Sequence, residues 1–174
     1  MKFRLFAMAA ASAVLSLAPM SAALAELPEG ASSINEDYQD WRVACVSVDN
    51  NDRCSMLHNQ VAKDSGQRVL SIELTAPTAD GLQGIVLMPF GLALANGVTL
   101  NIDTATDGPK FGFSTCLPQG CIAPIRFDAA MIDKLKNGGA LNITATVVDS
   151  GEPINITASL KGFTAAYNRL NALR

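Results

Sequence analysis

The strongest constraint on the fold is a period-two alternation of apolar and polar residues in short segments. Leu70, Ile72 and Leu74 fall on one face of such a segment. This alternation is typical of strands with one buried face, because successive side chains of a strand point to opposite sides. We therefore predict a mainly β fold, an antiparallel sandwich or barrel-like domain. The predicted strands lie at 41–48, 53–60, 68–74, 82–90, 97–103, 110–116, 121–127, 140–148 and 153–160.

One predicted strand, 82–90, is almost continuously apolar. Strands that are buried on both faces typically have such continuously apolar sequences, so we expect 82–90 to be covered on both sides. The overlapping segment 85–94, with the sequence IVLMPFGLAL, is also the best candidate for an exposed apolar binding surface. Core strand is the favoured interpretation of that segment, because apolar runs are usually buried.

Two helices are predicted among the strands. The first follows Asp128, the predicted N-cap, and ends at Gly138 and Gly139. The second closes the chain, with an apolar stripe at helical spacing that favours core packing over docking of a partner. The stripe consists of Phe163, Ala166, Tyr167, Leu170 and Leu173.

The first 25 residues have the pattern of a cleaved export signal. Lys2 and Arg4 precede an apolar run, and small residues at Ala23 and Ala25 predict cleavage after Ala25. The apolar run is too short to span a bilayer of about 30 Å, so a membrane anchor is disfavoured. A periplasmic protein is expected, with association with the outer membrane or secretion as further destinations.

The rest of the chain divides into a short lead-in and one domain. Residues 26–40 carry five acids and no base, which predicts a flexible acidic segment, and 41–174 form a single β-rich domain. The chain has 13 basic and 16 acidic residues, and the basic ones are scattered. This distribution excludes a footprint for nucleic acid or anionic lipid. No later apolar stretch reaches membrane-spanning length.

Cys45 and Cys54 have a spacing that fits a disulfide within one hairpin. If Asp49-Asn50 is a two-residue turn, Cys45 lies opposite Cys54 on a non-hydrogen-bonded rung. The Cα atoms of such a rung approach to about 4.5 Å, within disulfide range. Export to an oxidising compartment also favours pairing of the cysteines.

Cys116 and Cys121 flank Pro118-Gln119, which fits the centre of a tight turn and again places the two cysteines opposite each other. A thioredoxin-like redox site would instead need two residues between the cysteines and a helix N-terminus. A second structural disulfide is therefore favoured, and thiol–disulfide activity at this pair stays open as the alternative. The spacings of both pairs disfavour a four-cysteine zinc site.

The remaining polar motifs are best explained as parts of strands and turns. His58 is the only histidine and is interpreted as a polar strand residue, since no nucleophile motif accompanies it. Asp103 and Asp107 lack the regular ligand spacing of a calcium loop and are assigned to a strand end and turn. Asn142 and Asn155 begin Asn-Ile-Thr triplets that strand alternation explains without glycosylation. No catalytic residue, cofactor site or metal site is predicted.

Several segments together resemble the invasion-associated locus B family of exported bacterial proteins. The resemblance extends from Trp41 to Leu170, and its most specific parts are LMPFGLALANGVTLNID, the Cys116/Cys121 pair and the SLKGF ending. It implies a β-rich periplasmic, surface or secreted domain, in a family named for a member that promotes invasion of host red cells. Phe90 departs from the family, which more usually has a smaller residue there.

The resemblance implies no catalytic mechanism. The leading hypothesis is a non-catalytic envelope or binding protein whose partner is an unknown envelope or host protein or glycan. A role in host-cell invasion rests on the family name alone.

Disulfide mapping of the exported protein tests the predicted cysteine pairing in both hairpins. Non-reducing peptide mapping is expected to yield only Cys45–Cys54 and Cys116–Cys121 linkages, in a chain that begins at Glu26. A linkage between the two pairs would contradict the local-bridge interpretation.

Overall fold

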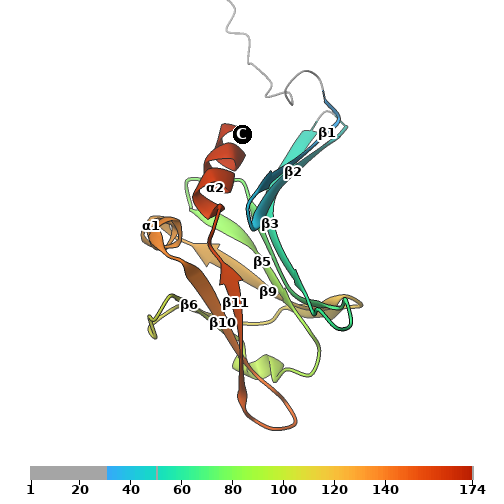
Figure 1. Ribbon diagram of the computed structural model, residues 1–174, viewed down its shortest axis with the longest axis vertical. Coiled ribbons are helices and arrows are strands. Elements are labelled where there is room, and N and C mark those ends of the chain that lie inside the picture. Colours follow the sequence, from blue (N-terminus) through green and yellow to red (C-terminus); the bar gives the residue numbers. More distant parts are fainter. Residues whose placement is uncertain (1–30, 50, 174) are drawn as a thin grey trace, which may run out of the picture.

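The computed structural model describes residues 31–49 and 51–173, in which the chain forms two antiparallel sheets and two α-helices (Figure 1). The predicted signal 1–25 lies outside the described residues. The strands are β1 (Ser33–Tyr38), β2 (Trp41–Val48), β3 (Asn51–Val61), β4 (Arg68–Thr75), β5 (Leu82–Met88), β6 (Val98–Ile102), β7 (Lys110–Phe111), β8 (Thr115–Leu117), β9 (Gly120–Phe127), β10 (Ala140–Thr146) and β11 (Pro153–Ser159). The helices are η2 (Leu94–Asn96, a 3-10 turn), α1 (Ala129–Asn137) and α2 (Phe163–Ala172).

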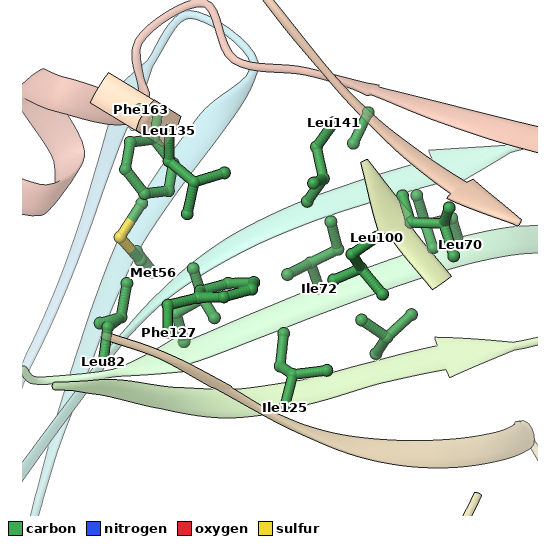
Figure 2. Close-up of a cluster of buried hydrophobic side chains, with 14 of the residues drawn as sticks. Met56, Leu70, Ile72, Leu82, Leu100, Ile125, Phe127, Leu135, Leu141 and Phe163 are labelled. Atoms are coloured by element: carbon green, nitrogen blue, oxygen red, sulfur yellow. The ribbon is translucent and has the colours of Figure 1, made fainter. Parts of the chain in front are cut away.

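The larger sheet has seven strands in the order β1-β2-β3-β4-β5-β9-β8, and the smaller has four in the order β11-β10-β6-β7. The prediction of a mainly β, antiparallel fold is confirmed. Side chains from both sheets and both helices meet in one core. Figure 2 shows Leu100 of β6 and Leu141 of β10 beside Ile72 of β4, so the two sheets enclose the core between them.

Both cysteine pairs lie in the hairpins that the sequence predicts. Cys45 pairs with Cys54 between β2 and β3, and Cys116 with Cys121 between β8 and β9. Both pairs form disulfides, with Cα–Cα distances of 4.1 Å and 3.9 Å. These distances match the closer, non-hydrogen-bonded kind of rung. Asp49 in the first turn has φ 51°, the left-handed conformation that Asp tolerates.

The two Asn-Ile-Thr triplets lie side by side on β10 and β11. Asn142 is opposite Thr157 and Thr144 is opposite Asn155. The Thr157 hydroxyl donates to the Asn142 amide oxygen at 2.8 Å, and the Thr144 hydroxyl donates to that of Asn155. Each triplet therefore supplies polar partners to the other across the strand pair.

Both predicted helices are present. The Asp128 carboxylate accepts the Met131 backbone N–H at 2.8 Å, which caps α1 as predicted. The stripe on α2 faces the core, with Phe163, Ala166 and Leu170 buried. Tyr167 and Leu173 are partly buried against the same core. Neither helix of the described residues is long and apolar enough to cross a membrane.

Trp41 joins the two sheets where β11 faces the larger sheet. Its side chain is 1% exposed, and its indole N–H donates to the Ser159 backbone carbonyl at 2.9 Å. The Phe163 ring lies edge-on to it with the centroids 5.1 Å apart. The Gln60 amide donates to the Thr157 carbonyl at 2.6 Å. Side chains of the larger sheet thus satisfy carbonyl groups of β11, an edge strand of the smaller sheet.

The prediction of a flexible segment over 26–40 is wrong for Ser33–Tyr38, which form the edge strand β1. β1 pairs with β2 from Ser33↔Val46 to Tyr38↔Trp41. The Glu36 carboxylate accepts two hydrogen bonds of 2.8 Å from Arg169 on α2. The acidic composition was misleading because this distant arginine, which local sequence cannot identify, neutralises Glu36.

The ion pair predicts how stability depends on pH. The Arg169 hydrogen bonds lower the pKa of Glu36. A carboxyl whose pKa is lower in the folded state stabilises the fold above its unfolded pKa of about 4.3, and this contribution disappears as the pH falls through the folded value.

Glu36→Gln is therefore expected to reduce the free energy of unfolding by about 0.5–1 kcal/mol at pH 7. Urea denaturation should show the difference from wild type shrinking as the pH is lowered below about 4. Asp37→Asn, in the exposed pair with Arg42, is the control and should have a smaller effect. A pH-independent loss in Glu36→Gln would mean that packing, and not charge, anchors β1.

Candidate functional site

The seven-stranded sheet has one face in the core and one outer face. Leu70 and Ile72 of β4, and Val86 and Met88 of β5, are buried on the inner face. The alternate residues of these strands point to the other side and are partly exposed. Among the described residues, the smaller sheet and both helices contribute their buried side chains to the inner side.

Apolar side chains that are partly exposed gather on the outer face, mainly on β5 and β9. Strand pairing places Ile85 beside Pro124, and Leu87 beside Ile122, on neighbouring strands. Glu73 lies between Leu57 and Ile85 and is the acid in the middle of this surface. We call this surface the outer patch and define it as Leu57, Val69, Ile85, Leu87, Ile122 and Pro124, all partly or fully exposed.

The segment 85–94 divides between core and surface. The expectation that 82–90 is covered on both faces is wrong, because Ile85 and Leu87 are only half-buried on the outer face. The favoured core-strand interpretation holds for the inward residues of the strand. Beyond β5, Leu92 is buried, whereas Phe90 is 59% exposed. A strand's alternation lets one apolar run supply both the core and an accessible surface.

Phe90 lies at an open pocket where three connecting segments meet. The pocket has a volume of about 550 Å³ and lies between the start of β4, the residues that follow β5 and the β8–β9 turn. We call it the rim pocket; it is lined by Gln67, Arg68, Pro89, Phe90, Pro118 and Gln119. Phe90 and the Pro118-Gln119 turn are distinctive in the sequence, whereas Gln67 and Arg68 carry no such signal. No local signal connects those two residues to a segment about 20 positions away, because tertiary packing brings them together.

The surroundings of the Cys116–Cys121 pair are those of a structural disulfide that cross-links the two strands of a hairpin. Both residues lie in strands, whereas a helix N-terminus would lower a thiol pKa. Cys116 is exposed and Cys121 is 3% exposed. The disulfide holds the hairpin whose turn, Pro118-Gln119, forms one wall of the rim pocket.

His58 takes part in a buried hydrogen-bond network. It is 4% exposed, and its Nδ1 lies 2.8 Å from the Asp40 carbonyl oxygen. The Gln60 amide nitrogen lies 3.2 Å from Nε2. With Nδ1 donating to the carbonyl and Nε2 accepting from the amide, both ring nitrogens have partners. His58 is therefore a strand residue that connects the β1–β2 turn to β3.

The acidic candidates are also accounted for by local structure. Asp103 has φ 51°, and its carboxylate accepts the backbone N–H groups of Gly139 and Ala140, both at 2.9 Å. It thereby ties the end of β6 to the start of β10, and Asp107 lies further along the same loop. Within the described residues, His, Cys, Asp and Glu side chains form no group of three that could hold a metal ion.

Comparison with known proteins places this architecture in a family. A family model described as Invasion associated locus B (IalB) protein matches residues 41–171. The chain is 47% identical over 157 residues to an invasion protein B homologue of Brucella abortus, covering 90% of each protein. It is 33% identical over 153 residues to invasion protein B of Bartonella bacilliformis, covering 87% of this chain and 82% of that protein. The crystal structure of invasion associated protein b from Bartonella henselae superposes with a TM-score of 0.74 at 32% identity, covering 80% of this chain and 96% of that one. The chain therefore belongs to the invasion-associated locus B family.

Proposed function

We propose that this chain is an exported, non-catalytic binding protein of the bacterial envelope, and that the outer patch contacts its partner. The observation that carries the proposal is a sheet face that no other element of residues 31–49 and 51–173 covers, with six partly or fully exposed apolar residues on adjacent strands. A group of accessible apolar side chains on a sheet face, with polar residues such as Glu73 among them, is a candidate interaction site. The partner is an envelope or host protein or glycan.

Two further observations support export and contact with other cells. Disulfides persist in oxidising compartments, and the chain has two of them. They favour a periplasmic or secreted destination after removal of residues 1–25. The similar proteins from Brucella and Bartonella are named as invasion proteins, which motivates a role in host-cell contact.

The outer patch can be tested without disturbing the core. In the double variant Ile85→Thr/Ile122→Thr, threonine keeps the β-branched shape that strands accept while removing apolar area. We expect wild type to retain a partner from an envelope or host-membrane fraction. The double variant should retain at least tenfold less of that partner, measured by quantitative mass spectrometry.

Val48→Thr is the matched control, because Val48 is 50% exposed in the β2–β3 hairpin, outside the patch. It should retain the partner as wild type does. Equal retention by the patch variant, with its fold verified by circular dichroism, would refute the role of the outer patch.

The redox alternative rests on the exposure of Cys116 and gives a different prediction. The double variant Cys116→Ser/Cys121→Ser is expected to lose about 2–3 kcal/mol of stability, as for other short-loop disulfides, and to keep partner binding. Urea denaturation and the capture assay measure the two effects. If wild type reduces insulin disulfides and the variant does not, the alternative is correct and the non-catalytic proposal fails.

A further inference from the structure

The rim pocket combines apolar ring faces with hydrogen-bonding side chains. Pro89, Phe90 and Pro118 supply the rings, and Phe90 is 59% exposed. The other lining residues, Gln67, Arg68 and Gln119, carry amide and guanidinium groups. Ligand sites generally have this composition, with apolar walls and a few polar groups that fix the orientation of the ligand.

The charge in the rim pocket is positive and uncompensated. Arg68 is the one charged residue of its lining. In the described part of the chain, Arg42 and Arg169 form ion pairs with Asp37 and Glu36, and Arg68 belongs to neither pair. A guanidinium presents paired donors that match a carboxylate in a bidentate geometry. The lining therefore complements a ligand with a single carboxylate.

The walls of the pocket are held in place by the fold. The Ala62 N–H donates to the Gln67 carbonyl at 2.8 Å, which closes the β3–β4 connection before Arg68. On the opposite wall, the Cys116–Cys121 disulfide cross-links the two strands of the β8–β9 hairpin. Gly120 there has φ 140°, and a Cβ atom at this position would lie 2.3 Å from the Met88 carbonyl oxygen. This close approach sets the Pro118-Gln119 turn against the end of β5, and such preorganisation lowers the entropic cost of binding.

We propose that the rim pocket binds a carboxylate-bearing sugar, such as a terminal uronic acid of a glycan. The Arg68 guanidinium pairs with the carboxylate, and the apolar face of the sugar ring stacks on Phe90. The amides of Gln67 and Gln119 both donate and accept, which matches hydroxyl groups that do the same. This inference deepens the proposed binding function and rests on it, by naming the ligand class of the surface beside the outer patch.

The local strand geometry favours a sugar over a peptide. A bound peptide commonly adds a strand to a free sheet edge and gains affinity from main-chain hydrogen bonds. The edge strand beside the rim pocket is β8, which has three residues, Thr115–Leu117. Such a short edge provides little main-chain pairing, so recognition must come from the pocket side chains.

Titration of the mature, full-length protein with glucuronic acid, followed by two-dimensional amide NMR, tests the proposal. Glucose, which has the same ring without the carboxylate, is the neutral comparison. Saturable shifts are expected at Gln67, Phe90 and Gln119 with glucuronic acid, and binding of glucose should be about tenfold weaker. Arg68→Gln should reduce affinity for glucuronic acid to that of glucose, and Phe90→Ala should weaken both sugars.

Arg126→Gln is the matched control, because Arg126 is an exposed arginine on β9 outside the rim pocket. It should bind glucuronic acid as wild type does. Three results would overturn the proposal: no saturable shifts in a folded protein, equal affinity for the two sugars, or tighter binding of an acetylated dipeptide carboxylate. These results leave the outer patch untouched, since partner capture by Arg68→Gln and by Ile85→Thr/Ile122→Thr reports on the two surfaces separately.

Discussion

The hydrogen bond from the Trp41 indole to the Ser159 carbonyl is the contact on which the arrangement of the two sheets depends. It joins the first residue of β2 to the last residue of β11, 118 positions later in the chain. Phe163, at the start of α2, packs edge-on against the same indole, so one side chain sets the position of both the smaller sheet and the terminal helix. A buried carbonyl without a donor costs roughly 1–3 kcal/mol, which makes this single N–H important to the junction. Through α2, the junction also holds β1, because Arg169 binds Glu36.

Because the smaller sheet and both helices pack on the inner face, no other element in the described part of the chain covers the outer face of the larger sheet. Its central strands are long and well paired, so they support apolar residues there without a second layer. The two disulfides strengthen hairpins at places that the junction does not reach. The second disulfide matters for the rim pocket and not for the outer patch, because it orders the turn that forms one wall of that pocket. Stability and ligand binding in the rim pocket are therefore linked through the β8–β9 hairpin.

Local sequence was sufficient wherever the partner of a residue lies nearby in the chain. The pairing of Cys45 with Cys54, and of Cys116 with Cys121, follows from turn length and the period of a strand. Asp128 as an N-cap is equally local. The prediction for 26–40 failed at β1 because the stabilising partner of Glu36 is Arg169, at the other end of the chain. The candidate site was predicted in part: segment 85–94 was identified as a possible surface, whereas Arg68 reaches the rim pocket only through the pairing of β4 with β5.

The sequence by itself determined the β-rich class, both helices, both hairpin disulfides and the family, since each depends on spacing within a short segment or on ordered motifs. Only the tertiary structure decided which apolar residues are accessible. Val86 and Ile85 are chemically similar neighbours, and the packing of the smaller sheet buries one and leaves the other on the outer face. Periodicity shows that a strand has two faces; which of them meets another layer is decided by contacts between residues far apart in the chain.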